Sequence, residues 1–331
     1  NGSWSALSSE VNGSVSALVF DAMGDLFAGG SFTTAGGVVA NRIAKWDGTS
    51  WSALGTGMDG SALTLAFSGS GDLYAGGSFT TAGGVVANGI ARWDGNTWSA
   101  LGTGVDGTVG TLAFDGVDNL YVGGSFTSAG GVAANCIAKW NGTSWSALGT
   151  GMTGGTGVGA LAFDSLGNLY AGGFFTAAGG VAANHLAVWD GSSWSALEPE
   201  VGNLVNALAF DASGNLYAGL CGGIGGVSGV RKWDGTVWST LVDGRSGARD
   251  APITRGTWAL AFDASGDLHA SDAFTVNHWD GSEWSKLGSG MDAPVRALVF
   301  DASGTLFASG DFTVAGGVAA NYIAKWETFQ P

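Results

Sequence analysis

Trp258 and Arg296 stand apart from the residues that correspond to them elsewhere in this chain. A short apolar run that ends in Phe recurs seven times, at Phe20, Phe67, Phe114, Phe163, Phe210, Phe262 and Phe300. The position four residues before the Phe holds a smaller side chain in the other five copies. A guanidinium offers planar donors to carboxylate, sulfate or phosphate groups, and an indole offers a flat face to a sugar ring. The pair therefore predicts a ligand-binding site.

The segment that leads into Trp258 adds charge to this candidate site. Leu241 to Phe262 spans 21 positions, whereas Leu54 to Phe67 spans 13, so this connection is enlarged. It carries a quarter of the 12 Lys and Arg residues together with two carboxylates, namely Arg245, Arg249, Arg255, Asp243 and Asp250. Either these residues bind a ligand beside the indole of Trp258, or they pair with one another and stiffen the loop. In the second case the indole fills the central channel of the ring-shaped fold described below.

His269 and His278 form a second candidate site, for a metal ion. The sixth copy of the repeat lacks a loop between its second and third strands, and a tight turn over 272–275 replaces it. This turn would place the two rings on neighbouring strands, with Asp272 as an oxygen ligand. Ordinary packing competes with this interpretation, because His269 replaces a Tyr or Phe and His278 replaces a Lys-like residue. Asp272 is also counted among the ligand-binding residues.

Carboxylates recur at the first turn of each copy except the second, which has Ser68 there. These turn residues are Asp21, Asp115, Asp164, Asp211, Asp263 and Asp301. Repeated Asp-rich turns can hold Ca²⁺ through oxygen ligands, but each turn has too few carboxylates for a calcium loop. The pattern favours capping of the turn, with Ca²⁺ as the alternative and no other cofactor expected.

The spacing of the seven Phe residues predicts the elements that position these candidates. The gaps of 47, 47, 49, 47, 52 and 38 residues match the period of a four-stranded propeller blade. In the first complete unit, an inner strand over 15–20 turns into a second strand over 26–30. A third strand over 41–46 then turns at Asp47-Gly48 into an outer strand over 51–54.

The two ends of the chain complement each other. Residues 1–7 repeat the turn and outer strand found at 47–54, whereas the last copy stops after its third strand, at Trp326. We therefore expect an all-β, seven-bladed propeller of four-stranded antiparallel blades, in which residues 1–7 complete the C-terminal blade. Residues 1–331 would then form a single domain.

The unit resembles a kelch repeat in its Leu26–Gly30, Trp46–Gly48 and Trp51–Leu54 segments and in Met58. Kelch repeats place an aromatic near a double glycine, then an aromatic-Asp pair, then a Trp. The chain differs in using Trp46 where Tyr is common, and in an added Phe-Thr-x-Ala-Gly-Gly-Val-x-Ala-Asn segment. The resemblance, to bacterial kelch-like proteins of secreted or surface type, implies a propeller that serves as an interaction scaffold, a sugar-related enzyme or a surface protein.

The charge and composition exclude several partners. The formal net charge is −15, from 12 Lys and Arg against 27 Asp and Glu, which opposes binding to nucleic acid or to anionic lipid. No stretch approaches the roughly 20 apolar residues of a membrane span. The abundance of Gly, Ser, Thr, Trp and Asp is typical of secreted β-proteins, so an extracellular or cell-surface location is expected.

Three functions follow from these observations. The first is a non-enzymatic binding module for a glycan or a small polar or anionic ligand, using the loop face of blades six and seven or repeated grooves between blades. The second is a structural or protein-interaction subunit of an extracellular or surface assembly. The third is a hydrolase or lyase at the channel mouth that uses Asp243, Asp250 or Asp272 as acid or base. No nucleophile elbow, zinc-type spacing or phosphate loop supports catalysis.

Overall fold

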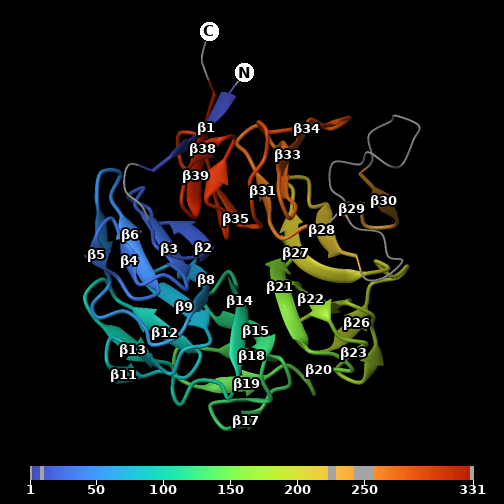
Figure 1. Cartoon of the computed structure of the whole chain (residues 1–331). Coiled ribbons are helices and arrows are strands. Elements are labelled where there is room, and N and C mark those ends of the chain that lie inside the picture. The colour runs from blue at the N-terminus through green and yellow to red at the C-terminus, as the bar shows by residue number, and fades with distance from the viewer. Residues whose placement is uncertain (1, 8–10, 223–228, 242–255, 329–331) are drawn as a thin grey trace.

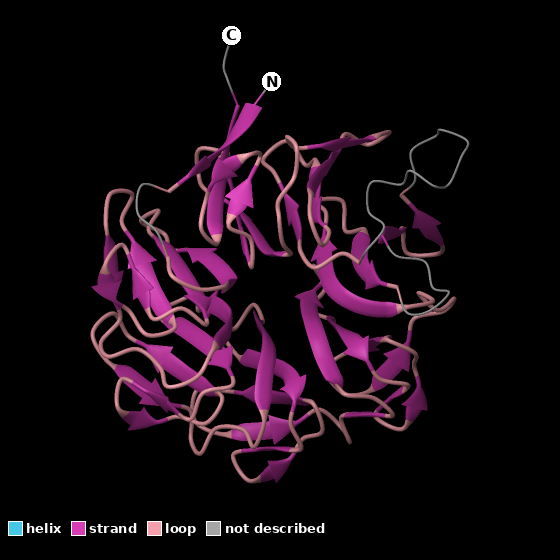
Figure 2. Ribbon diagram, viewed as in Figure 1, coloured by secondary structure: helices cyan, strands magenta, loops and turns pink. Residues whose placement is uncertain are grey.

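The chain folds into strands and loops. The structure, a computed structural model, describes residues 2–7, 11–222, 229–241 and 256–328, and these contain no helix (Figure 2). The described residues form seven four-stranded sheets, all of whose strand pairs are antiparallel. The four-stranded antiparallel unit expected from the repeat is therefore confirmed.

Each sheet uses its strands in the order in which the repeat supplies them, from the inside of the ring outwards. The first strands are β2 (Val15–Phe20), β8 (Ala62–Phe67), β14 (Thr108–Phe114), β21 (Gly157–Phe163), β27 (Leu204–Phe210), β31 (Leu260–Phe262) and β35 (Val295–Phe300). The second strands are β3 (Leu26–Gly30), β9 (Leu73–Gly77), β15 (Leu120–Ser125), β22 (Leu169–Phe174), β28 (Leu216–Cys221), β32 (Leu268–Ser271) and β36 (Leu306–Gly310).

The outer half of each sheet carries the paired Trp residues. The third strands are β6 (Ile43–Trp46), β12 (Ile90–Trp93), β18 (Ile137–Trp140), β25 (Leu186–Trp189), β29 (Gly229–Trp233), β33 (Val276–Trp279) and β39 (Ile323–Thr328). The fourth strands are β7 (Trp51–Ala53), β13 (Trp98–Ala100), β19 (Trp145–Ala147), β26 (Trp194–Ala196), β30 (Trp238–Thr240), β34 (Trp284–Lys286) and β1 (Gly2–Ala6).

The sheets stand around a closed ring (Figure 1). Each first strand contacts the first strand of the next sheet, from β2 through β8, β14, β21, β27, β31 and β35 and back to β2. The second strand of each sheet is covered on its two faces by the two neighbouring sheets. In β3, for example, all five residues are buried. This burial on both faces explains why the second strands are almost continuously apolar instead of alternating.

Neighbouring sheets are joined by the Trp residues of the fourth strands. The indole Nε1 of Trp98 donates to the carbonyl of Leu54 in the preceding sheet at 2.9 Å, and Trp145 and Trp194 repeat this bond to Leu101 and Leu148. One buried cluster shows the same joint, because Ile43 of the first sheet packs with Trp98 of the second. A buried indole thus supplies apolar area and a satisfied donor at once.

A bulge interrupts the start of the first strand in several sheets. In the first sheet Val15 pairs with Gly30 and Ala17 with Gly29, so Ser16 is the extra residue. The backbones approach closely here, because a Cβ on Gly30 would lie 2.0 Å from the carbonyl oxygen of Ser14. The double glycine of the repeat therefore allows the bulge, and the bulged residue is left outside the ladder.

The added Phe-Thr segment forms a short hairpin at the outer margin of the ring. In the first sheet it consists of β4 (Thr34–Ala35) and β5 (Val38–Val39), joined by Gly36 and Gly37 at φ 57° and 78°. The corresponding short strands are β10 (Thr81–Ala82), β11 (Val85–Val86), β16 (Ser128–Ala129), β17 (Val132–Ala133), β23 (Ala177–Ala178), β24 (Val181–Ala182), β37 (Val314–Ala315) and β38 (Val318–Ala319). In the fourth sheet a further short strand, β20 (Met152–Thr153), pairs with β23. Positive φ at both turn residues is the reason that this turn uses glycine.

The ring is closed by strand pairing between the two ends of the described chain. Strand β1 pairs with β39, with Trp4 opposite Trp326, and becomes the outermost strand of the sheet β1-β39-β36-β35. Trp4 is buried, its ring lies 5.3 Å from that of Trp326, and its Nε1 donates to the carbonyl of Leu287 at 2.9 Å. That residues 1–331 form one domain remains a prediction.

Replacing Trp4 tests how much this closure contributes to stability. We expect Trp4→Ala to lower the free energy of unfolding by about 3–5 kcal/mol, because it removes a buried indole from the joint between two sheets. Ser3→Ala, an exposed neighbour on the same strand, is the control and should change the value by less than about 0.5 kcal/mol. Equal urea midpoints for the two variants would show that the closing strand contributes little.

A second test concerns the carboxylate that holds the β10–β11 hairpin. Asp59 accepts hydrogen bonds from the backbone N–H groups of Thr80 and Thr81 at 2.8 and 2.9 Å. Burial acts to raise the pKa of Asp59, but these bonds and that from the Thr80 hydroxyl outweigh it and lower the pKa to about 2. Asn12 accepts the same pair of backbone bonds in the first sheet, so an amide fits this position.

We expect Asp59→Asn to keep its stability at neutral pH and Asp59→Ala to lose about 1 kcal/mol. The folded carboxyl has the lower pKa, so its contribution is present above pH 4 and is lost as the pH falls towards 2. Wild-type protein should therefore lose more stability over this interval than Asp59→Asn, measured by urea unfolding at fixed pH values. Parallel curves for the two proteins would contradict this assignment.

Candidate functional site

The structure brings Trp258 and Arg296 together. Trp258 lies just before β31, and Arg296 lies in β35 of the adjacent sheet. The Arg296 guanidinium sits over the Trp258 ring, 5.6 Å from its centroid, and 38% of Trp258 is exposed. Arg296 is the extra residue of a bulge, because Val295 pairs with Gly310 and Ala297 with Ser309. A bulge redirects a side chain away from the sheet, which explains how this position reaches a neighbouring sheet.

Asp311 holds the guanidinium in place. Nε and Nη2 of Arg296 donate to the two carboxylate oxygens of Asp311 at 2.9 and 2.6 Å. Hydrogen bonds from Arg296 lower the pKa of Asp311 against the opposing effect of its burial, and the same bonds raise the pKa of Arg296. Both groups are therefore charged, and the pair as a whole is neutral. An exposed indole beside a fixed, neutral donor-acceptor pair can stack on a ring and hydrogen bond with its substituents.

Sequence reasoning missed Asp311. It follows the double-glycine position of the seventh sheet, where the first three sheets have Ser31, Ser78 and Ser125. Only the seventh copy combines a carboxylate there with an Arg at the bulge. Reading the two strands as a pair, instead of the first strand alone, would have found it.

The other residues predicted to bind a ligand beside Trp258 and Arg296 divide into two groups. Asp243, Arg245, Arg249, Asp250 and Arg255 lie outside the described residues. Asp272 is described and buried, and its Oδ1 accepts from the N–H groups of Phe274 and Thr275 at 2.9 and 2.7 Å and from the Thr275 hydroxyl. Asp272 therefore caps its own tight turn.

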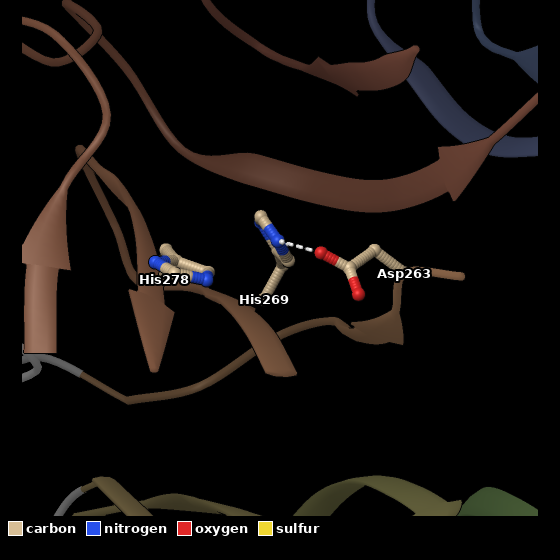
Figure 3. A group of neighbouring side chains, drawn as sticks. All are labelled: Asp263, His269 and His278. Atoms are coloured by element: carbon tan, nitrogen blue, oxygen red, sulfur yellow. Dashed lines mark hydrogen bonds and ion pairs between the residues drawn. The ribbon is translucent and has the colours of Figure 1, made fainter. Parts of the chain in front are cut away.

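The two histidines lie opposite each other, as their spacing predicted. His269 of β32 pairs with His278 of β33, and their ring centroids are 4.8 Å apart. The carboxylate beside them is Asp263 and not Asp272 as expected: ligand atoms of Asp263, His269 and His278 lie within 4.8 Å of one another (Figure 3). Asp272 follows the C-terminal end of β32, whereas His269 lies near the start of this strand, and the carboxylate of Asp272 accepts hydrogen bonds from its own turn. Burial first, and then the proximity of His278, lowers the pKa of His269 to about 4, so the ring is neutral at pH 7.

The recurring carboxylates of the first turns cap those turns. Oδ1 of Asp21 accepts from the N–H groups of Met23 and Asp25, both at 2.9 Å. Ser68 fills the same role in the second sheet by accepting from the N–H of Asp72 at 3.1 Å. A hydroxyl and a carboxylate thus serve equally, as expected for a cap. The alternative of Ca²⁺ at these turns remains a prediction.

Grooves run between neighbouring sheets at the end of the ring that carries these turns. The groove between the first and second sheets has a volume of about 520 Å³ and is lined by Phe27, Lys45, Phe67 and Trp93 among others. The corresponding groove between the fifth and sixth sheets has a volume of about 180 Å³. The larger groove is of a size that accepts small ligands.

No family model and no curated protein sequence matches the chain. Solved structures do match in fold. An extracellular domain of a putative hybrid two-component system from B. thetaiotaomicron superposes with a TM-score of 0.64 at 12% identity, over 95% of this chain and 39% of that one. Virginiamycin B lyase from Staphylococcus aureus gives 0.65 at 11%, over 99% and 100% of the two chains. A family 74 xyloglucanase from Xanthomonas campestris gives 0.60 at 16%, over 94% and 54%.

The chain is a β-propeller. At these identities the structural similarity shows the fold alone. The matching structures include both extracellular domains and enzymes. This propeller spans about two fifths of the length of the extracellular domains that it matches. The kelch-like character of its repeats remains a prediction. Among the described residues of this propeller, no helix is long and apolar enough to cross a membrane.

Proposed function

We propose that this propeller is a non-enzymatic, extracellular or surface protein that binds a glycan at the loop face of its sixth and seventh sheets. The observation that carries the proposal is the exposed Trp258 indole next to the Arg296–Asp311 pair. Sugar rings stack on indole faces, and their hydroxyls are both donors and acceptors. Arg296 lies in β35, Trp258 lies just before β31 and Asp311 follows directly after β36, so all three side chains are on or next to strands and little ordering cost opposes binding.

The charge of the site favours a neutral glycan over an anionic one. The charge of Arg296 is balanced by Asp311, and the chain as a whole carries −15. An anion would therefore approach a negatively charged protein and meet no uncompensated cation among these three residues. Sulfated and acidic sugars are the comparison ligands, because the arginines at 245, 249 and 255 would favour them.

A glycan array followed by calorimetric titration tests this proposal. We expect binding of a neutral oligosaccharide that Trp258→Ala weakens at least tenfold, corresponding to about 1.4 kcal/mol. The thermal midpoint should change little, because the indole is partly exposed. Leu166→Ala is the control: Leu166 is 86% exposed in the turn between β21 and β22, at the other end of its sheet. Unchanged binding by Trp258→Ala would show that the glycan does not bind at this site. A preference for sulfated sugars would instead favour the arginines at 245, 249 and 255 as the binding residues.

A protein-interaction role is the second candidate, and one observation favours it. The short outer hairpins expose valines in repeated positions, with Val39 67% and Val86 68% exposed, and β5, β11 and β17 lie at the outer margin of the ring in Figure 1. Val38, Val85, Val132, Val181 and Val318 are exposed at related sites. Repeated apolar side chains on one margin suit self-association or docking on another protein.

Sizing of the purified protein tests this second role. If the valines mediate self-association, the particle should exceed the 33.0 kDa of one chain, and Val39→Ser combined with Val86→Ser should reduce it to a monomer. Thr33→Ser on the same segment serves as the control. A wild-type monomer at all concentrations would leave this margin without a role in self-association.

A further inference from the structure

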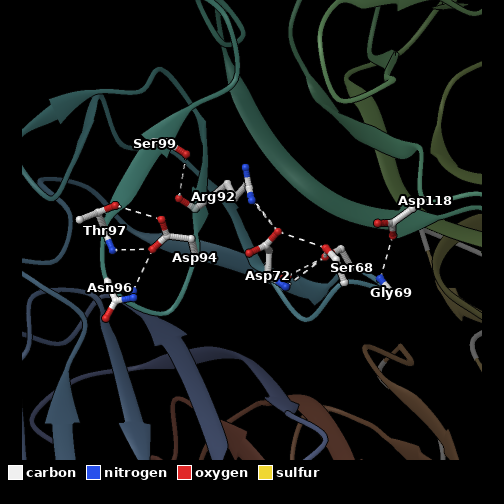
Figure 4. A network of polar contacts seen from close by, with 10 residues as sticks. Ser68, Gly69, Asp72, Arg92, Asp94, Asn96, Thr97, Ser99 and Asp118 are labelled. Carbon is white, nitrogen blue, oxygen red and sulfur yellow. Dashed lines mark hydrogen bonds and ion pairs between the residues drawn. The ribbon is translucent and has the colours of Figure 1, made fainter.

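A cation recurs between an aromatic ring and a turn carboxylate in several sheets. In the first sheet the Lys45 ammonium lies 5.6 Å from the Phe27 ring centroid and 2.5 Å from an oxygen of Asp25. In the fifth sheet Lys232 lies 5.3 Å from the Tyr217 ring and 3.7 Å from Asp211. The third sheet repeats the arrangement with Lys139, Tyr121 and Asp115. In the second sheet Arg92 reaches Asp72 at 2.7 Å (Figure 4).

The sixth sheet keeps the carboxylates of this arrangement and replaces the rest. His269 takes the position of the aromatic ring and His278 that of the cation, with Asp263 and Asp267 in the adjoining turn. His269 Nε2 lies 3.4 Å from Asp263, and His278 Nε2 lies 3.2 Å from Asp267. Two carboxylates thus meet two imidazoles where the first, second, third and fifth sheets supply a positive charge.

We propose that this cluster binds a divalent transition-metal ion of the zinc class, held by Asp263, His269 and His278, with Asp267 beside them as a fourth ligand. The ion would supply, in the sixth sheet, the positive charge that Lys or Arg supplies elsewhere. Imidazole nitrogen combined with carboxylate oxygen suits zinc and its neighbours, whereas Ca²⁺ and Mg²⁺ prefer oxygen alone.

The geometry is close to that of a bound ion. Ligands about 2.0–2.2 Å from a tetrahedral ion lie roughly 3–4 Å from one another. The nitrogen-oxygen contacts of 3.4 and 3.2 Å fall in this range, and the three-residue group spans at most 4.8 Å. Binding of an ion would require the most widely separated of these ligand atoms to move closer together. The side chains of His278 and Asp267 are 25% and 40% exposed, so an ion has a path from solvent.

The surroundings fit ligand rings that bind through one nitrogen. His278 Nδ1 lies 3.4 Å from the Ser285 hydroxyl, which orients the ring and leaves Nε2 on the carboxylate side. His269 is only 7% exposed and packs edge-on against Phe300, with the ring centroids 4.9 Å apart, and its Nδ1 has no hydrogen-bond partner in the described part of the chain. Without an ion the Asp263 carboxylate accepts from Nε2, so this nitrogen carries the proton, and metal binding would transfer that proton to Nδ1 and leave the Nε2 lone pair for the ion.

The chain itself provides the best test variant. His269→Tyr combined with His278→Lys gives the sixth sheet the Tyr-Lys pair of the fifth sheet, and this variant should fold without a metal. His185→Asn is the matched control, because it removes a histidine outside the cluster, and Asn tolerates the φ of 67° found there. His278→Lys alone is the fallback if the double variant does not fold.

The experiment measures the thermal midpoint of the chelator-treated full chain with zinc chloride, and in parallel with calcium chloride. We expect zinc at a hundredfold excess over its dissociation constant to raise the midpoint of wild type and His185→Asn by about 5 °C. Calcium should have no effect, and the Tyr-Lys variant should not respond to either ion. Cobalt substitution should give visible absorption bands in wild type that the Tyr-Lys variant lacks.

Two results would overturn the proposal. One is the absence of any zinc-dependent shift in wild type. The other is an equal shift in wild type and in both His278→Lys and the Tyr-Lys variant, which would assign the effect to carboxylates elsewhere on the protein. A response to calcium that matches the response to zinc would identify an oxygen-only site, and so would also count against the two histidines as ligands.

Discussion

Every other feature of this protein depends on the closure of the ring by β1 and β39. Each second strand is buried because a sheet stands on both of its faces, so a sheet at an open end would expose an apolar face to water. Apolar area contributes roughly 25 cal/mol per Å² on burial, and the joint between two sheets contains an indole and several aliphatic side chains. The strand at residues 2–6 thus completes the seventh sheet, and through Trp4 it also joins that sheet to the sixth.

Much of the fold could be predicted from the residues, and particular ones show why. The alternation and the Phe-to-Phe period fix strand and turn, and the fragment around Trp4 complements the one around Trp326 as the structure shows. The opposition of His269 and His278 followed from the length of one turn. In each case the decisive information was a spacing along the chain, which strand geometry converts directly into position.

The candidate site was harder to predict because it depends on pairs across strands. The bulge at Arg296 breaks the alternation of its own strand, so a single-strand pattern gives the size of the side chain but not its direction. Asp311 was missed, and Asp272 was placed beside the histidines instead of Asp263, which was assigned only to its turn. The sequence shows that a carboxylate lies near a turn, but not whether the backbone N–H groups of that turn will bind it. The charged segment between Leu241 and Gly256 lies outside the described residues.

The sixth sheet departs from the repeat in its loops and also carries polar residues in its interior. Ser271 and Asn277 are fully buried, and the Ser271 hydroxyl accepts from the N–H of Ala259 and donates to the carbonyl of Val295. The Asn277 Nδ2 donates to the Thr275 hydroxyl at 2.9 Å, whereas its Oδ1 has no hydrogen-bond partner among the described residues. Buried polar groups are stable inside a protein when they are hydrogen bonded. The ring can therefore contain a sheet whose sequence departs from the repeat, because the sheets on either side of it still pack against it.

Gly2 pairs with Thr328, so the backbone at the start of β1 lies next to that at the end of β39. A short covalent link between these points would make the ring continuous, and a cut in any exposed turn, such as that at Gly48, would then give a permuted chain with the same contacts. The seam between strands would move to another sheet. The same fold should therefore form when the chain termini are placed in a different sheet of the ring.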